Sequence, residues 1–407
     1  MLNLKKTLPG MLFALVLICG LASAQEARKR APKAAENGLP PDAHQLNIGE
    51  SAPDFSLKGI DDRNYSLASF KDARLLMVVF LSNHCPYSHA AETRLLPFAA
   101  EMKARGLAIV AINPNHPDAV RVDELGYSKY SDSFEEMKLY AKERQFTFPY
   151  LYDGETQSTA KAYGCLATPH VFVFDRERQL RYMGRFDDSR FADASTVTSS
   201  DARNAIEALL AGKPVPVEVT QPMGCSTKWR SKQVENTHIE EQWNSTPVLL
   251  ETIDATGATA LARNDTKKLR LINVWATWCS PCVKEFPGLV SLSRRLGSRD
   301  FELITISVDD PGATNRVQQF LTRQHAVASS RLQSSIKNEG RKTNNYLFTG
   351  ANTDALMKGL DPAAAGPVPH TVLIAPGGKI LYRQSGQVDA ADLQAKVLEE
   401  LGPYYER

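Results

Sequence analysis

The sequence contains few cysteines for its length, six in 407 residues. So few cannot form the dense disulfide framework of small secreted domains. The 48 Lys and Arg residues nearly balance the 46 Asp and Glu residues, and no long basic run follows the first thirty residues, so nucleic acid is not indicated as a partner. A Gly-rich phosphate loop, a nicotinamide-binding fingerprint and a Ser–His–Asp set are also missing, and we therefore predict no cofactor.

Long apolar runs are equally scarce, and the one that stands out lies at the N-terminus. Lys5 and Lys6 precede the apolar stretch 11–21, and Ala22-Ser23-Ala24 supplies the small residues of a cleavage site. This pattern predicts a signal peptide, residues 1–24, and a mature protein in the periplasm or outside the cell. A retained signal, or a lipid on Cys19, is the alternative that would anchor the chain to the membrane.

Five cysteines remain after this cleavage, which leaves at least one without an intramolecular disulfide partner. Few, widely spaced cysteines in an exported chain favour redox chemistry over structural cross-linking. They are Cys85, Cys165, Cys225, Cys279 and Cys282.

The composition divides the mature chain into two domains and their connections. Residues 25–45 are rich in Ala, Lys, Arg, Pro and Glu and predict a flexible tether. Residues 46–211 form the first predicted domain and residues 239–407 the second. Between them, residues 212–238 are rich in Pro and Val, include Cys225, and predict an extended tail and linker.

The two domains repeat one order of elements. The continuous apolar runs 73–81 and 268–276 predict buried strands, and each is followed by a cysteine and a helix. Second strands are predicted at 106–112 and 301–307. Later, Thr168-Pro169 and Val368-Pro369 each precede a predicted hairpin. The pattern indicates a duplicated α/β unit.

The second domain resembles the extracytoplasmic thiol–disulfide oxidoreductases of the TlpA and ResA type. The resemblance rests on Trp-Ala-Thr-Trp-Cys-Ser-Pro-Cys at 275–282, on Glu285 and Pro287, and on the Val368-Pro369 loop. It extends over most of residues 247–401.

The first domain resembles the redoxin branch related to peroxiredoxins, the AhpC/TSA proteins. The resemblance spans about residues 48–229 and is carried by Ala-Pro-Asp-Phe at 52–55, Asn-His-Cys-Pro-Tyr at 83–87 and Gly-Cys-Ser-Thr-Lys-Trp at 224–229. Together the two resemblances imply an α/β chain of two thioredoxin-like folds in tandem, each a central mixed sheet flanked by helices. They also imply that Pro169 and Pro369 are cis and face the active cysteines.

The Cys279–Cys282 pair has the spacing that thiol–disulfide exchange requires. A helix N-terminus stabilises a thiolate, so Cys279 is the predicted nucleophile and Cys282, one turn deeper, the thiol that releases the mixed disulfide. Pro281 fits the first turn, where an N–H is dispensable. Trp278 flanks the pair. The alternative is half of a zinc site, but a second ligand pair at zinc spacing is missing.

Glu285 follows Cys282 on the same predicted helix. It either assists proton transfer near Cys282 or is an exposed carboxylate, and the sequence leaves both interpretations open.

Cys85 opens the corresponding helix of the first domain, but Ser88 replaces the second cysteine. Ser88 and His84 are predicted to support the Cys85 thiolate. Cys165 and Cys225 are both candidates to resolve an oxidised Cys85. Alternatively they bridge each other, or Cys165 is simply buried.

Peroxidase activity at Cys85 is disfavoured by the sequence. Peroxiredoxins carry Pro seven residues before the cysteine and Thr three before it, and here these positions are Val78 and Ser82. A copper or zinc site of Cys85 with His84, His89 and His170 is a further alternative, although exposed or orienting histidines are commoner and we predict no metal.

These observations predict an extracytoplasmic enzyme that reduces disulfides of envelope proteins through Cys279 and Cys282. Its predicted partners are protein thiols and disulfides, cytochrome c apoproteins among them, and a membrane or periplasmic thiol electron donor. Cys279 is further expected to recycle Cys85 across the flexible linker. Two alternatives remain: a thiol peroxidase that uses Cys85, with the second domain as its reductase, and a first domain that binds a partner or carries a metal.

Overall fold

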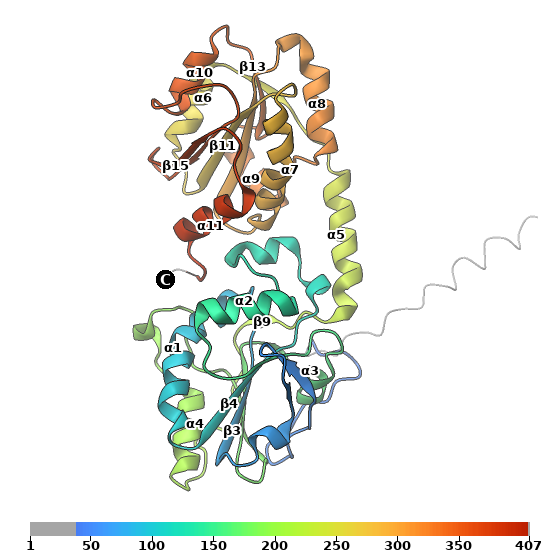
Figure 1. Cartoon of the computed structure of the whole chain (residues 1–407), viewed down its shortest axis with the longest axis vertical. Coiled ribbons are helices and arrows are strands. Elements are labelled where there is room, and N and C mark those ends of the chain that lie inside the picture. The colour runs from blue at the N-terminus through green and yellow to red at the C-terminus, as the bar shows by residue number, and fades with distance from the viewer. Residues whose placement is uncertain (1–37, 406–407) are drawn as a thin grey trace, which may run out of the picture.

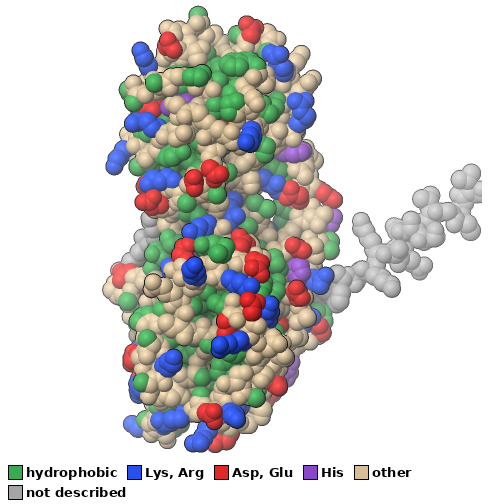
Figure 2. All heavy atoms as spheres, in the orientation of Figure 1, with side chains coloured by type: hydrophobic (Ala, Val, Ile, Leu, Met, Phe, Trp, Pro, Cys, Tyr) green, Lys and Arg blue, Asp and Glu red, His purple; other side chains and the backbone are tan. Residues whose placement is uncertain are grey.

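The computed structural model describes residues 38–405, so the predicted signal peptide lies outside the described residues. Figure 1 shows two α/β units stacked along the long axis, with helix α5 (Gln233–Ser245) beside their junction. Acidic and basic side chains are interspersed over the face seen in Figure 2. Between residues 38 and 405, no helix combines the length and the apolar character needed to cross a membrane.

The first unit is built on a seven-stranded sheet of order β2-β1-β5-β4-β3-β7-β8. The middle strand β3 is buried on both faces: Met77 and Val79 enter one apolar cluster, and Leu76 and Val78 enter the other. It pairs in parallel with β4 and antiparallel with β7, so the sheet is mixed. The strands are β1 (Leu57–Gly59), β2 (Asn64–Tyr65), β3 (Leu75–Phe80), β4 (Leu107–Asn113), β5 (Tyr150–Tyr152), β7 (His170–Phe174) and β8 (Leu180–Gly184).

The second unit has a six-stranded mixed sheet of order β10-β13-β12-β11-β14-β15. Its middle strand β11 pairs in parallel with β12 and antiparallel with β14. Ile272 and Val274 face one apolar cluster, whereas Leu269 and Leu271 face another. The strands are β10 (Glu251–Ile253), β11 (Leu269–Trp275), β12 (Phe301–Ser307), β13 (Asn345–Phe348), β14 (His370–Ile374) and β15 (Ile380–Ser385).

Helices cover the sheets of both units (Figure 1). Those of the first unit are α1 (Pro86–Lys103), α2 (Phe134–Arg144), α3 (Ser158–Tyr163) and α4 (Asp201–Leu210). Those of the second are α6 (Ala255–Arg263), α7 (Ser280–Arg295), α8 (Thr314–Arg323), α9 (Ser330–Asn338), α10 (Thr353–Leu360) and α11 (Ala390–Leu401). Short 3₁₀ helices are η1 (Leu67–Phe70), η2 (Pro117–Ala119), η3 (Val122–Tyr127), η4 (Ala194–Thr196), η5 (Arg230–Lys232) and η6 (Pro311–Ala313).

The predicted duplication is visible in both units. Each central strand runs into the helix that begins just after its cysteine, α1 after Cys85 and α7 after Cys279. Both predicted hairpins form, as β7–β8 and β14–β15. The Thr168–Pro169 and Val368–Pro369 bonds are cis, as the resemblance implies.

The segment before the first sheet corrects one expectation. Residues 25–45 were expected to be a flexible tether, yet Leu39 is buried in a core cluster of the first unit. The backbone N–H of His44 also donates to the carbonyl of Lys161. Residues 38–45 therefore pack on the first unit, because an apolar side chain in this polar stretch finds a core to enter.

The segment between the units is also more ordered than a Pro- and Val-rich linker suggests. Cys225 and Ser226 form a short strand β9 that pairs antiparallel with β6 (Ala167–Thr168). The boundary expected at residue 239 falls inside helix α5, which has no buried residue. A helix rises only about 1.5 Å per residue, so this half of the linker cannot provide the reach of an extended chain.

The two units meet through the C-terminal end of α7. The Arg295 guanidinium donates to the carbonyls of Leu125 and Ser128, and that of Arg299 donates to Gly126. A hollow beside α5 adjoins this contact (Figure 2), and a cleft of about 590 Å³ there is lined by residues of both units and by α5. The C-terminal end of α7 therefore faces the first unit.

Candidate active site

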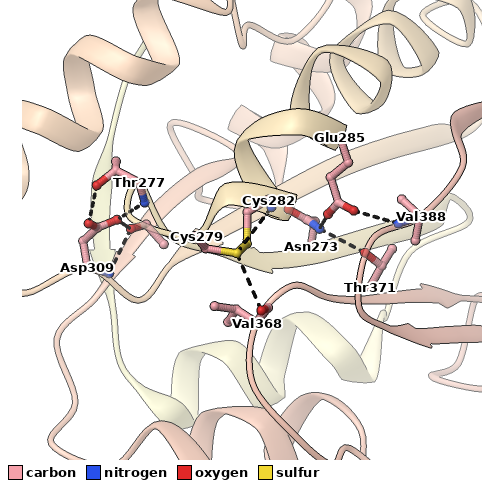
Figure 3. Close-up of a disulfide and its surroundings, with 10 residues drawn as sticks. Asn273, Thr277, Cys279, Cys282, Glu285, Asp309, Val368, Thr371 and Val388 are labelled. Carbon is pink, nitrogen blue, oxygen red and sulfur yellow. Dashed lines mark hydrogen bonds between the residues drawn. A yellow bond between two sulfur atoms is a disulfide. The ribbon is translucent and has the colours of Figure 1, made fainter.

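Cys279 and Cys282 lie where β11 passes into α7, with Cys279 as the N-cap residue of the helix (Figure 3). They form a disulfide with an S–S distance of 2.02 Å. The backbone N–H of Cys282 points to the Cys279 sulfur at 3.3 Å. Cys279 is 5% exposed and Cys282 is fully buried. A partner therefore reaches Cys279 first, and the helix N-terminus is placed to stabilise its thiolate.

The surface around Cys279 is apolar and open. Trp278 is 65% exposed, Val283 is also exposed, and Pro281 occupies the first turn of α7. The carbonyl oxygen of Val368, just before the cis Pro369, lies 3.6 Å from the Cys279 sulfur (Figure 3). This arrangement offers backbone and apolar contacts to a peptide that approaches the sulfur.

Glu285 is buried behind the disulfide, so its interpretation as an exposed carboxylate is wrong. Its Oε1 accepts from the side-chain amide of Asn273 at 2.9 Å, and its Oε2 accepts from the N–H of Val388 at 2.7 Å (Figure 3). The Asn273 amide also donates to Thr371. Burial raises the pKa of Glu285, although the hydrogen bonds from Val388 and Asn273 oppose the shift. A carboxyl group of raised pKa is suited to exchange a proton near neutral pH.

Asp309 fixes the loop that carries Trp278, and no local sequence pattern indicated this role. Its carboxylate accepts from the backbone N–H of Thr277 at 2.8 Å and from the Thr277 hydroxyl at 2.5 Å (Figure 3). The Ser307 hydroxyl donates to the same carboxylate. The loop before Cys279 is therefore held by the residues that follow β12.

A second pair of thiols lies at the matching place in the first unit. Cys85 is the N-cap residue of α1 and is fully buried. Its sulfur lies 3.0 Å from the carbonyl oxygen of Thr168, just before the cis Pro169, and 2.8 Å from the sulfur of Cys225. The pairing of β9 with β6 brings Cys225 there. The structure thus unites two of the three predicted cysteines of this unit.

Positive charge and backbone donors stabilise the Cys85 thiolate. Burial alone would raise its pKa, but the hydrogen bond with Cys225, the charge of His84 and the N–H of Ser88 outweigh it and lower the pKa to about 6. His84 in turn lies 2.6 Å from the Asp132 carboxylate, which overcomes the effect of burial and raises the pKa of His84. Ser88 acts through its backbone, since its hydroxyl accepts from the N–H of Ser82 instead.

Cys165 does not join this pair. Its sulfur contacts the carbonyl oxygen of Ala167 and the hydroxyl of Thr227, each at 3.4 Å. It is fully buried, and burial raises the pKa of its thiol to about 12. Of the alternatives left open by the sequence, a buried core thiol fits this environment, and a Cys165–Cys225 bridge does not.

The neighbouring histidines are engaged elsewhere. His89 lies with its two ring nitrogens 2.7 Å and 3.0 Å from the carbonyls of Asn83 and Pro403, and His170 accepts from the N–H of Leu166. Within residues 38–405 no group of three or more His, Cys, Asp or Glu side chains is placed to hold a metal ion.

Two family models match the chain, one for each unit. The AhpC/TSA family matches residues 48–183, and the Redoxin family matches residues 246–399. Together with the two mixed sheets described above, these matches confirm the expected pair of thioredoxin-like folds.

Two curated proteins are similar to part of the chain. The thiol:disulfide interchange protein HelX of Rhodobacter capsulatus is 28% identical over 130 residues, which are 32% of this chain and 59% of HelX. The thiol-disulfide oxidoreductase ResA of Bacillus subtilis is 25% identical over 115 residues, 28% of this chain and 51% of ResA. The chain thus spans between half and three fifths of the length of these relatives.

Solved structures also resemble parts of the chain. A hypothetical protein from Sinorhizobium meliloti 1021 is 38% identical and covers 46% of this chain and 98% of its own, with a TM-score of 0.41. A protein described as a thiol:disulfide interchange protein DsbE from Chlorobium tepidum is 20% identical and covers 41% of this chain and 99% of its own, with a TM-score of 0.31.

Proposed function

The chain is a tandem of two redoxin-type domains, one of the AhpC/TSA family and one of the Redoxin family, and we propose that it is a thiol–disulfide oxidoreductase whose redox centre is Cys279–Cys282. The observation that carries this proposal is the disulfide at the N-terminus of α7, with Cys279 5% exposed and Cys282 fully buried. The names of the two curated relatives support the same activity. The domain limits, 46–211 and 239–407, are part of the proposal.

The reaction transfers two electrons to a partner disulfide. The Cys279 thiolate attacks one sulfur of the partner, a mixed disulfide forms, and the other partner sulfur leaves as a thiolate that takes up a proton. Cys282 then loses its proton and attacks the Cys279 sulfur. This step releases the second partner thiol and closes the Cys279–Cys282 disulfide, which a thiol donor must reduce again.

The residues around the pair have three roles in this reaction. The first turn of α7 and the N–H of Cys282 favour negative charge on Cys279. Glu285, one turn beyond Cys282 and held by Asn273, accepts the Cys282 proton. Val368 and Trp278 hold the partner peptide beside Cys279.

The compartment and the partners are also proposals. The N-terminal pattern of Lys5, Lys6, an apolar run and Ala22-Ser23-Ala24 supports export to the periplasm or beyond the cell. The partners in that compartment would be disulfides of envelope proteins and a membrane or periplasmic thiol donor. If the signal is retained or lipidated, the same centre works at the membrane.

The experiment is capture of a mixed disulfide. The Cys282→Ser protein, produced with its N-terminal segment in a Gram-negative host, should accumulate adducts with envelope proteins that thiol reductants release. The Cys279→Ser/Cys282→Ser protein is the control and should capture none. The proposal is contradicted if the Cys282→Ser protein yields no adduct and the natural protein also fails to reduce insulin.

A peroxidase at Cys85 is a second candidate, supported by the lowered pKa of this thiol. The hydroxyl of Ser82, which occupies the position of the peroxiredoxin Thr, faces the Thr168 hydroxyl at 3.0 Å. Val78 is buried in the core in place of the peroxiredoxin Pro. Peroxide consumption that disappears in Cys85→Ser would decide for this activity.

A further inference from the structure

Cys85 and Cys225 lie together although 140 positions separate them in the chain. The tail that carries Cys225 folds back and pairs through β9 with β6, the strand that leads into the cis Pro169. In this register Thr168 lies opposite Cys225. A Cβ on Gly224 would come within 2.1 Å of the Thr168 carbonyl oxygen, so only glycine allows the tail to approach this closely.

The distance between the two sulfurs is short enough for bond formation with little movement. They are 2.8 Å apart, whereas a disulfide bond is about 2.05 Å long, so closure requires about 0.8 Å. A side-chain rotation or a small shift of the tail covers this difference. We propose that Cys85 and Cys225 are a second thiol–disulfide centre, which exchanges electrons with thiols and disulfides of partner proteins independently of Cys279–Cys282.

The two sulfurs have unequal roles because their surroundings differ. Cys85 is fully buried beneath Thr168 and Cys225, whereas Cys225 is partly exposed. His84 and the N–H of Ser88 support a thiolate on Cys85. The hydrogen bond to Cys85, burial and the negative charge of Cys85 raise the pKa of Cys225. Cys225 is therefore the sulfur that partners reach, and Cys85 is the better leaving group.

A partner dithiol reduces the oxidised pair in two exchange steps. A partner thiolate attacks the Cys225 sulfur of the oxidised pair, the Cys85–Cys225 bond breaks, and Cys85 leaves as a thiolate. A second partner thiol, once deprotonated, attacks the partner sulfur of the mixed disulfide and releases Cys225, which takes up a proton. The partner has lost two electrons and two protons. The pair has gained the two electrons and one proton, which is on Cys225, and the other proton passes to solvent. The same steps in reverse oxidise the pair with a partner disulfide.

The second unit contributes one wall of this site. The carbonyl oxygen of Pro403 lies 3.0 Å from the ring of His89, and the Tyr405 ring packs edge-on against Tyr87 and Tyr127 at centroid distances of 5.2 and 5.3 Å. The charge of Cys225 is among the causes that raise the pKa of Tyr405. A partner thiol thus enters beside the C-terminal segment of the second unit.

The test uses the full chain with Cys279→Ser and Cys282→Ser, so that its outcome does not depend on the proposed function. The protein is incubated with oxidised glutathione and unfolded, and its remaining thiols are alkylated. Peptide mass spectrometry should then show a Cys85–Cys225 disulfide and an alkylated Cys165. Adding Cys165→Ser should leave this disulfide unchanged, whereas adding Cys225→Ser should abolish it.

Graded mixtures of reduced and oxidised glutathione should convert the pair in one two-electron transition. Peptide mapping of the natural sequence under non-reducing conditions gives the same readout without any substitution, in case a variant fails to fold. The inference is overturned if Cys85 and Cys225 both remain alkylatable in oxidised glutathione, or if Cys85 pairs with Cys165.

Discussion

The Asn273 amide donates a hydrogen bond of 2.9 Å to the Glu285 carboxylate, in the core behind the Cys279–Cys282 disulfide. Asn273 thereby fixes one oxygen of a carboxylate that lies one turn beyond Cys282 on α7, and the N–H of Val388 fixes the other oxygen. The pair links the central strand β11 to the helix that carries both cysteines. In the proposed reaction, proton transfer at Cys282 depends on a carboxyl group whose position the strand determines.

Replacing Glu285 by Gln should slow the release of mixed disulfides. The amide keeps the size of the side chain but cannot take up a proton, so the rate of insulin reduction should fall by about tenfold to a hundredfold. The pH profile should also lose the limb that the raised pKa of Glu285 causes. Glu399→Gln, on the exposed face of α11, is the matched control. An unchanged pH profile would show that Glu285 only packs.

Replacing Trp278 by Ala should weaken the reaction with proteins but not with small disulfides. The exposed indole offers apolar area to a peptide and makes no contribution to the thiolate itself. We expect kcat/KM for insulin to fall about tenfold, which is about 1.4 kcal/mol, while the rate with oxidised glutathione stays the same. Val234→Ala, an exposed residue on α5, is the control. Equal losses with both substrates would point to damage at Cys279.

Replacing His84 by Asn should raise the pKa of Cys85. In the natural protein the thiolate is lost as pH falls through about 6, because the hydrogen bond with Cys225, the charge of His84 and the Ser88 N–H together outweigh burial. Without the imidazolium the midpoint of the thiolate ultraviolet absorbance should move up by roughly one pH unit or more. The substitution leaves Lys228, Glu92 and Cys225 unchanged, and each of these groups also interacts electrostatically with His84 or Cys85.

The control for this titration is His44→Gln, which changes an exposed histidine. The absorbance should be followed with Cys279 and Cys282 replaced by Ser. A midpoint that stays at the natural value in His84→Asn would mean that His84 does not set the charge of Cys85.

Acidification should remove the stability that the buried, neutral histidines contribute to the first unit. Burial lowers the pKa of His170 to about 3 and that of His89 to about 4. In the unfolded chain both groups take up a proton as pH falls through about 6.5, so the unfolded state binds more protons and stability falls between pH 6.5 and these values. At pH 5 each contributes about 2 kcal/mol of lost stability.

Urea denaturation at pH 7 and pH 5, resolved to the first unit by hydrogen exchange of its peptides, measures this loss. Burial raises the pKa of Glu92 to about 7 and that of Asp153 to about 6, and these two groups act in the opposite direction. The change in stability from pH 7 to pH 5 should therefore be less unfavourable in His170→Gln than in the natural chain, by about 2 kcal/mol. Equal changes in the two proteins would contradict the neutral, buried state of the His170 ring.

The sequence was sufficient to predict the fold wherever the pattern is local. The runs around β3 and β11 are apolar without interruption, since both faces of these strands are buried, and each ends in a helix-capping cysteine. The hairpins after Pro169 and Pro369 followed from turn residues and alternation. The Cys279–Cys282 pair was predicted for the same reason, because three residues of spacing on a helix determine its geometry.

The remaining features depend on contacts between distant segments. The sequence offered both Cys165 and Cys225 as candidates to reach Cys85 and could not choose between them. Asp132 contacts His84 because the loop before α2 folds over the end of β3. Helix α5 was missed since it buries no residue and therefore has no apolar stripe. The flexible linker expected to let Cys279 recycle Cys85 is replaced by this helix and by the contact of Arg295 with the first unit, and the recycling itself stays a prediction.

The direction of α7 determines how the two centres can communicate. Its C-terminal end rests on the first unit, and its sixteen residues place Cys279 about 24 Å farther along the helix axis, on the side of the second unit that faces outward. Cys85 lies at the junction. We therefore expect electrons to pass between the two proposed centres through a collision with another molecule. Their exchange would be second order, faster in concentrated protein and suppressed by dilution.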